Sequence, residues 1–161
     1  MNRTVFTALA ALVLAFGVPH AMAQDKAKAA SKGTAAEATA MVQKAIAHIK
    51  KVGREKAFAE FDSKSGAFTD RDLYVVVYDM KGKVLAHGAN EKMIGKDVID
   101  LRDSDGKYFV KERVEMMSKS PEAKGWQDYK FMNPVTRQIE PKSMFLQRYE
   151  DLIVGCGIYK N

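Results

Sequence analysis

Apolar residues recur at spacings of three and four along the first part of the chain, and this pattern predicts one long helix with a single buried face. The stripe consists of Ala38, Met41, Val42, Ala45, Ile46, Ile49 and Val52. Thr34, with Glu37 three residues later, predicts a capping box at the start of this helix. Gly53 predicts a weakened or bent helix, which continues over residues 54–61.

Residues 72–87 predict a β-hairpin around which the rest of the chain is arranged. Leu73–Tyr78 is apolar and rich in valine and tyrosine, as is typical of a strand, and Val84–His87 is a second short apolar run. Between the two runs, Gly82 can supply the positive φ that a tight turn needs. This hairpin is the candidate floor of a ligand pocket.

Beyond the hairpin, the pattern predicts a loop or one irregular helical turn over residues 88–96, a helix over Tyr108–Lys119 and then three strands. The strands are Trp126–Phe131, Pro141–Tyr149 and Leu152–Tyr159. Short turns between consecutive strands predict antiparallel pairing. The predicted fold class is therefore α+β, with a long N-terminal helix packed on a five-stranded antiparallel sheet.

The N-terminus has the layout of a secretory signal peptide. A short basic start precedes the apolar run Val5–Val18, and the small residues Ala21 and Ala23 predict cleavage after Ala23. The apolar run has 14 residues, fewer than the about 20 that span a bilayer, so a retained membrane anchor is the less favoured alternative. We expect a signal peptide over 1–23, a flexible leader over 24–36, one domain over 37–161 and a periplasmic location.

Charge and cysteine content narrow the choice of partners. The formal net charge is +6, but the 26 Lys and Arg residues are interspersed with the 20 Asp and Glu residues and form no basic block. This spread, together with export, indicates that nucleic acid is not a partner. Cys156 is the single cysteine, so no intramolecular disulfide can form. Its place between two glycines of an apolar strand predicts a buried, unreactive side chain.

The sequence lacks a nucleophile elbow, a phosphate-binding glycine loop and a paired-histidine metal signature. We therefore expect no enzymatic activity, no cofactor and no metal. The segment Asp103–Gly106 is interpreted as a turn rather than a calcium loop, because the remaining ligands of an EF-hand are missing. His48 lies off the apolar stripe and is predicted to be exposed. A hydrolase or redox enzyme is the weakest alternative, and it would need a histidine–carboxylate cluster around His87.

Aromatic residues and one lysine predict a binding site instead. Tyr74 and Tyr78 share one face of the first hairpin strand, Trp126 and Tyr129 add aromatic area, and Lys142 stands at the start of a later strand. An apolar recess with one ammonium group suits a small carboxylate, because a low dielectric strengthens the charge contact. The alternative is that the aromatic residues are core and Lys142 is a solvated strand residue, and spacing alone favours that alternative.

An ordered series of short motifs makes the chain similar to a known family. The motifs are Leu73–Asp79, Lys81–His87, Ile94–Asp97, Asp105–Lys107, Gly125–Tyr129, Asn133–Pro134, Pro141–Ser143 and Gly155–Tyr159. Over residues 37–160 this series resembles the single Cache domain, and most closely the small-molecule-sensing type found in chemoreceptors and sensor kinases.

The resemblance implies a PAS-like antiparallel sheet with the long N-terminal helix along it. It also implies a pocket on the other face of the sheet for small carboxylates, amino acids or similar metabolites. Phe109 and Arg113 would belong to the helix over this pocket, and His87 would end the second strand. The ligand-binding residues that the resemblance implies are Tyr74, Tyr78, His87, Phe109, Arg113, Trp126, Tyr129 and Lys142.

Members of this family usually lie between two transmembrane helices, whereas this sequence ends at Asn161 without a second apolar segment. We therefore expect a free periplasmic sensory module that binds a small organic acid or amino-acid-like ligand and passes its ligand state to a membrane sensor protein. We also expect a homodimer through the N-terminal helix. The alternative function is a structural or interaction protein that uses the same scaffold without a small ligand.

Overall fold

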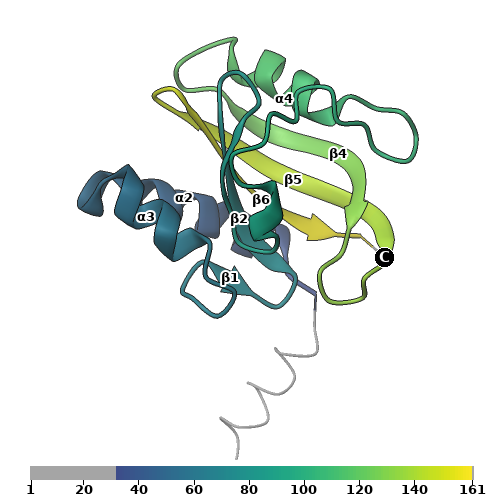
Figure 1. The fold of residues 1–161 in the computed structure, drawn as a ribbon, viewed down its shortest axis with the longest axis horizontal. Helices are drawn as coiled ribbons and strands as arrows, with labels where there is room; N and C mark the ends of the chain where they lie inside the picture. The colour runs from purple at the N-terminus through teal and green to yellow at the C-terminus, as the bar shows by residue number, and fades with distance from the viewer. Residues whose placement is uncertain (1–31, 161) are drawn as a thin grey trace, which may run out of the picture. The chain divides into compact units, whose positions relative to one another are not determined.

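The computed structural model describes residues 32–160, so the predicted signal peptide and most of the predicted leader lie outside the described residues. The chain is α+β, as predicted (Figure 1). Its elements, in order, are α2 (Ala35–Val52), α3 (Arg54–Phe61), β1 (Thr69–Asp70), β2 (Leu73–Asp79), β3 (Val84–His87), the 3-10 turn η1 (Glu91–Met93), α4 (Phe109–Met117), β4 (Lys124–Met132), β5 (Ile139–Tyr149) and β6 (Leu152–Tyr159). None of the helices within residues 32–160 is long and apolar enough to cross a membrane.

The predicted capping box forms the start of α2. The Thr34 hydroxyl accepts a hydrogen bond from the Glu37 backbone N–H at 3.3 Å, and the Glu37 carboxylate accepts one from the Thr34 backbone N–H at 2.9 Å. The helix starts at Ala35, two residues before the predicted domain boundary at 37. Gly53 does more than bend the helix, because its φ of 84° and ψ of 164° end α2 and α3 begins at the next residue.

The sheet is antiparallel and has the strand order β1-β2-β6-β5-β4, with β3 also paired to β2. The β2–β3 hairpin turns at Gly82, whose φ of 91° favours glycine. The five predicted strands are confirmed, and β1 is a sixth strand that the sequence analysis did not predict. It has two residues and turns directly into β2 at Arg71, so it is too short to show an alternating pattern.

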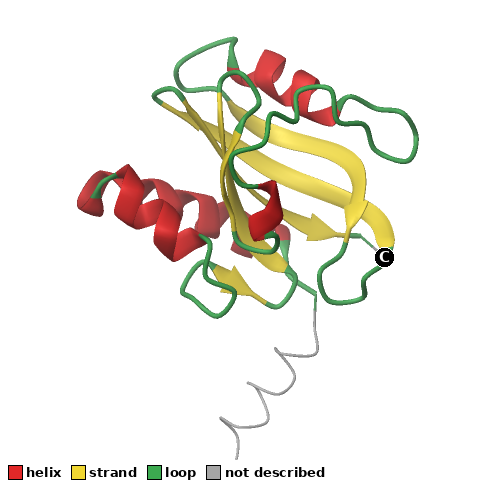
Figure 2. Cartoon of the chain, in the orientation of Figure 1, coloured by secondary structure: helices red, strands yellow, loops and turns green. Residues whose placement is uncertain are grey.

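Different elements cover the two faces of the sheet (Figure 2). On one face, the apolar stripe of α2 and residues of α3 pack on strand residues such as Val75, Val77 and Cys156. On the other face, α4 and the segment 88–108 pack on a second core that includes Tyr74, Val76 and Tyr78. Side chains alternate along a strand, so the consecutive residues of β2 supply both cores.

Two predictions concern the face covered by α2 and α3. Cys156 is fully buried, as predicted, with its Sγ 3.6 Å from the Met41 Sδ, and burial raises the pKa of its thiol to about 12. The prediction that His48 is exposed is wrong. Its side chain is 22% exposed, its ring centroid lies 5.0 Å from that of Phe68, and its Nε2 lies 2.8 Å from a Glu60 carboxylate oxygen. Phe68 follows α3 in a loop, so the helical pattern around His48 does not reveal this contact.

Candidate functional site

Seven of the eight residues suggested as ligand-binding lie on the sheet face covered by α4. Tyr74 and Tyr78 come from β2, His87 from the end of β3, Phe109 and Arg113 from α4, Tyr129 from β4 and Lys142 from β5. All seven are buried, none with more than 7% of its surface exposed. The sheet therefore brings together side chains that are far apart in the sequence.

Lys142 is the centre of this group. It is 1% exposed, and its Nζ donates hydrogen bonds to the hydroxyl oxygens of Tyr74 at 2.7 Å and Tyr159 at 3.1 Å. The same nitrogen lies 4.0 Å from the centroid of the Tyr74 ring and 4.4 Å from that of Tyr159. The alternative that Lys142 is a solvated strand residue is therefore wrong.

The aliphatic part of Lys142 lies across β6 at Gly157. A Cβ atom at Gly157 would lie 2.6 Å from the Lys142 Cε and 3.0 Å from the Ser143 carbonyl oxygen, so only a residue without a side chain fits there. Burial, together with the charge of Arg113, lowers the pKa of Lys142 to about 7, although Cys156 and Asp72 act in the opposite direction.

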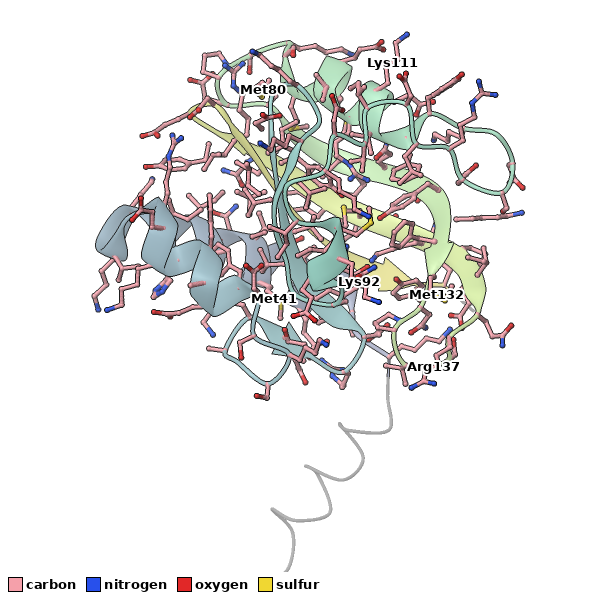
Figure 3. All side chains as sticks on the ribbon, in the orientation of Figure 1. Met41, Met80, Lys92, Lys111, Met132 and Arg137 are labelled. Carbon is pink, nitrogen blue, oxygen red and sulfur yellow. The ribbon has the colours of Figure 1, made fainter. Side chains whose placement is uncertain are left out.

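Tyr159 belongs to the site although the sequence analysis gave it no role. It lies directly opposite Lys142 in the β5–β6 register, and its hydroxyl donates to the carbonyl oxygen of Met132 at 2.6 Å. Met132, labelled in Figure 3, ends β4. The alternation of β6 could have placed Tyr159 on the same face as Gly157, two residues earlier, but the pairing with β5 that brings it to Lys142 is not visible in the sequence.

His87 stacks on the Tyr74 ring, with 5.1 Å between the ring centroids. Its Nδ1 accepts hydrogen bonds from the backbone N–H groups of Asn90 at 3.1 Å and Ala89 at 3.3 Å. Burial, with the charges of Lys142 and Arg113, lowers the pKa of His87 to about 4, so the ring is neutral at pH 7. Asp62 accepts from the His87 backbone N–H at 2.8 Å, not from the ring, so this contact forms no histidine–carboxylate pair of the catalytic kind.

Arg113 is fully buried in the same group. Its Cζ lies 4.9 Å from the centroid of the Tyr78 ring, 5.4 Å from that of Phe109 and 5.2 Å from that of Tyr129. Both its Nε and its Nη2 donate to one oxygen of Gln127, at 3.2 and 3.1 Å. Its Nη1 is buried and has no hydrogen-bond partner.

Gln127 was also not identified from the sequence. Its amide nitrogen donates to the Phe109 carbonyl oxygen at 2.8 Å. This hydrogen bond orients the amide so that its oxygen accepts the hydrogen bonds from Arg113. Gln127 and Tyr129 are two residues apart in β4 and therefore share a face. That spacing was visible in the sequence, but the contact with α4 was not.

Trp126 lies away from the other seven residues. It is 40% exposed, it pairs directly with Phe145 on β5, and the two ring centroids are 5.4 Å apart. Phe145 belongs to the core under α2. Trp126 and Tyr129 are three residues apart in one strand, so alternation places them on opposite faces of the sheet.

The segment interpreted as a turn is a turn in the structure. One carboxylate oxygen of Asp103 accepts from the backbone N–H groups of Asp105 at 2.9 Å and Lys107 at 3.0 Å, and the other accepts from that of Lys130 at 3.0 Å. Within the described part of the chain, no group of three or more His, Cys, Asp or Glu side chains is arranged to hold a metal ion.

Comparison with known proteins adds independent information about the family. The chain matches the family model described as Single Cache domain 2 over residues 18–161. A curated relative, the sensor histidine kinase MctS of Rhizobium johnstonii, is 30% identical over 91 residues, which cover 55% of this chain and 19% of the kinase. The chain thus spans less than a fifth of the length of that relative.

Solved structures share the fold. A methyl-accepting chemotaxis protein from Vibrio parahaemolyticus is 21% identical with a TM-score of 0.66, over 86% of this chain and 90% of that chain. A Cache chemosensory domain solved in work on carboxylic acid recognition is 18% identical, also with a TM-score of 0.66, over 90% of this chain and 100% of that domain. At these identities the likeness shows the fold alone. With the family match over most of its length, the chain belongs to the single Cache domain family.

Proposed function

We propose that this chain is an extracytoplasmic sensory module that binds a small organic acid or a similar anionic metabolite. The observation that carries the proposal is the buried ammonium group of Lys142, held by two phenol oxygens and in no ion pair with the described carboxylates. Buried charges in proteins are usually paired. A ligand carboxylate would supply the missing partner.

The surroundings of Lys142 suit this role. Burial raises the pKa of Tyr74 well above its ordinary value, so its phenol stays protonated and can donate to a carboxylate oxygen. The Tyr74, Tyr159 and His87 rings exclude water, which strengthens a charge contact. The contacts of Lys142 with the two phenols must open to admit a ligand, and a carboxylate would then take the place of neutral acceptors.

The comparisons support a sensory role. The curated relative is a sensor histidine kinase, one structural neighbour is a chemotaxis protein and another is a domain studied for carboxylic acid recognition. We infer a periplasmic location after cleavage of the predicted signal peptide, and a membrane sensor protein as the partner that receives the ligand signal.

A homodimer through α2 stays part of the proposal, with one restriction from the fold. The apolar stripe of α2 is already packed on the sheet. A dimer seam would therefore use the opposite, exposed side of the helix, which includes Ala40 and Ala47.

A thermal-shift screen of small organic acids on the exported protein tests the proposal. We expect at least one acid to raise the midpoint of unfolding, and we expect Lys142→Met to abolish that shift. Lys124→Met, at an exposed lysine of β4, is the matched control and should keep the shift. If the best acid shifts the Lys142→Met variant as much as the natural protein, Lys142 is not the anchor.

The alternative function is a structural or interaction protein with the same scaffold, and the burial of Lys142 and of the aromatic residues around it is the observation that favours it. Native mass spectrometry of protein purified from periplasm separates the two functions. A co-purified organic acid supports the sensory module. If no acid co-purifies and no acid in the screen shifts the unfolding midpoint, the result supports the function as a structural or interaction protein.

A further inference from the structure

The exposed apolar side chains of the protein gather on one hairpin. Five large apolar residues among residues 32–160 are exposed, and three of them belong to the β4–β5 hairpin. They are Met132, Val135 and Ile139, which are 48%, 64% and 54% exposed. Met132 and Ile139 are directly opposite each other in the β4–β5 register, so their side chains lie on one face of the sheet. Single exposed apolar residues are common, but a cluster of them marks a binding surface.

The loop of this hairpin is held in one conformation by Asn133. Its backbone N–H donates to the Gln138 carbonyl oxygen at 2.8 Å, and its carbonyl oxygen accepts from the Arg137 N–H at 2.8 Å. Its side-chain oxygen accepts from the Val135 N–H at 2.9 Å, and its amide nitrogen donates to Glu140 at 2.9 Å. The loop therefore presents Val135 to solvent from a fixed backbone, and a surface that is already ordered loses little entropy on binding.

Arg137 has a strained backbone in the same loop. Its φ of 59° is in the left-handed region, which glycine and asparagine adopt more readily than arginine. Its side chain is exposed and forms no ion pair with another residue of the range 32–160. An exposed guanidinium beside apolar side chains suits a surface that is apolar and carries phosphate groups, because a guanidinium forms paired hydrogen bonds with a phosphate.

The hairpin lies at the end of the molecule where the described chain begins (Figure 1). The Lys32 Nζ is 3.4 Å from a Glu140 carboxylate oxygen and donates to the Lys160 carbonyl oxygen at 3.0 Å. Arg137 is at this end, and Lys111 of α4 is at the opposite end (Figure 3). The segment that precedes Lys32 in the sequence is therefore attached beside the hairpin.

That attachment ties the hairpin to a membrane during export. The predicted signal peptide places the apolar run Val5–Val18 in the membrane until cleavage. Lys32 follows Val18 by 14 positions, which corresponds to at most about 50 Å at about 3.5 Å per residue. The tip of the hairpin is thus within reach of a bilayer from the time the domain folds.

The small size of the tip favours a lipid surface over a second protein. A stable protein–protein interface takes about 20–30 residues from each partner, whereas the tip offers three apolar residues and one arginine. A fluid bilayer needs no matching shape, and a few apolar side chains with a basic residue are enough to hold a protein on it reversibly.

We propose that the tip of the β4–β5 hairpin binds the surface of a bilayer that contains anionic phospholipids. Met132, Val135 and Ile139 enter the boundary between headgroups and acyl chains, and Arg137 pairs with a headgroup phosphate. These side chains are outside the buried group around Lys142, so the proposal does not depend on a ligand there. Binding of this kind keeps the exported protein at the membrane surface.

Flotation of the exported protein with vesicles of equal parts phosphatidylcholine and phosphatidylglycerol tests the proposal. We expect the natural protein to bind these mixed vesicles. The double variant Val135→Thr/Ile139→Thr should bind at least about 10-fold more weakly, because each replacement removes apolar area that the bilayer buries. Leu101→Thr, at an exposed leucine outside the hairpin, is the matched control and should bind as the natural protein does.

Arg137→Asn tests the charged part of the site separately. Asparagine accepts a positive φ better than arginine does, so the unfolding midpoint should stay the same or rise. Affinity should fall about 5-fold for the mixed vesicles and much less for vesicles of phosphatidylcholine alone. Lys111→Gln also removes an exposed positive charge, at the other end of the molecule, and should leave both affinities unchanged.

Several results would overturn the proposal. One is a natural protein that floats with neither kind of vesicle, and another is equal binding by the natural protein and the double variant. If vesicles are not bound and sedimentation shows that the double variant dissociates an oligomer, the hairpin is instead an interface between copies. An Arg137→Asn variant that keeps the natural preference for mixed vesicles overturns the role of Arg137.

A gain-of-binding variant covers the case in which circular dichroism shows the double variant to be unfolded. Val135→Trp places a larger apolar side chain at the tip, so it should bind the mixed vesicles more tightly than the natural protein. Its tryptophan emission should also move to shorter wavelength when vesicles are added, beyond any change in the natural protein. Emission that does not move would show that the tip stays in water, and the proposal would be wrong.

Discussion

Replacing Lys142 with methionine is expected to stabilise the protein at neutral pH, although it removes two hydrogen bonds. Methionine has a similar length and flexibility, so it can follow the same path over Gly157 without a charged end. The two phenols keep partners, because the Tyr74 and Tyr159 oxygens are 3.3 Å apart and Tyr159 still donates to Met132. The main change is therefore the loss of a buried ammonium group.

The expected magnitude follows from the pKa of Lys142. Burial lowers this pKa from 10.5 to about 7, which corresponds to about 4 kcal/mol of destabilisation at pH 7 at about 1.36 kcal/mol per pKa unit. The two hydrogen bonds to the phenols contribute about 1 kcal/mol each in the other direction. Lys142→Met should therefore raise the free energy of unfolding by about 2 kcal/mol at pH 7.

The gain in stability from Lys142→Met should decrease as the pH rises. The folded protein binds the Lys142 proton less tightly than the unfolded chain does, so between pH 7 and pH 10.5 the unfolded chain holds more protons. The stability of the natural protein therefore rises with pH in this window, and the advantage of the variant shrinks from about 2 kcal/mol at pH 7 to about zero at pH 9.

Urea denaturation at pH 7, 8 and 9 measures the effect, with Lys124→Met as the control that should keep the pH slope of the natural protein. A variant that is less stable than the natural protein by the same amount at all three values would refute the reasoning. In that case Lys142 would be stabilised in its charged form by its surroundings, and the site would have no need of a ligand anion.

Three further outcomes are expected from urea or thermal unfolding. Gly157→Ala should destabilise the protein by about 1–3 kcal/mol, because its Cβ would overlap Lys142, whereas Gly125→Ala, whose Cβ meets an atom at 3.5 Å, should have little effect. His87→Gln should reduce the loss of stability between pH 6.5 and pH 4, because the pKa of His87 is lowered from 6.5 to about 4 and the natural protein loses up to about 3 kcal/mol there. Thr34→Ala should cost about 1 kcal/mol through loss of the helix cap.

The sequence predicted the elements whose signal is local. The stripe of α2, its capping box at Thr34 and the positive φ at Gly82 each depend on residues within a few positions of one another. Because these three signals are local, the sequence alone was enough to predict them, and the structure confirms all three. The two-residue strand β1 and the half-buried His48 were missed because each depends on a neighbour outside its own pattern.

The candidate site could be predicted only in part, because its side chains come together through pairing between distant strands. Tyr74 and Lys142 are 68 residues apart, and their contact depends on β6 lying between β2 and β5. Tyr159 and Gln127 were missed for the same reason, since their partners lie across a strand pair and on α4. The misplacement of Trp126 was avoidable, because an odd spacing from Tyr129 already puts the two side chains on opposite faces.

The lowered pKa of Lys142 links binding to the acidity of the surroundings. A ligand carboxylate beside the ammonium would raise that pKa again, so above pH 7 the protein would take up a proton from solution as it binds the acid. Affinity would then increase as the pH falls toward 7 and level off below it. A sensory module built in this way would respond to the concentration of an organic acid and to the protons released with it.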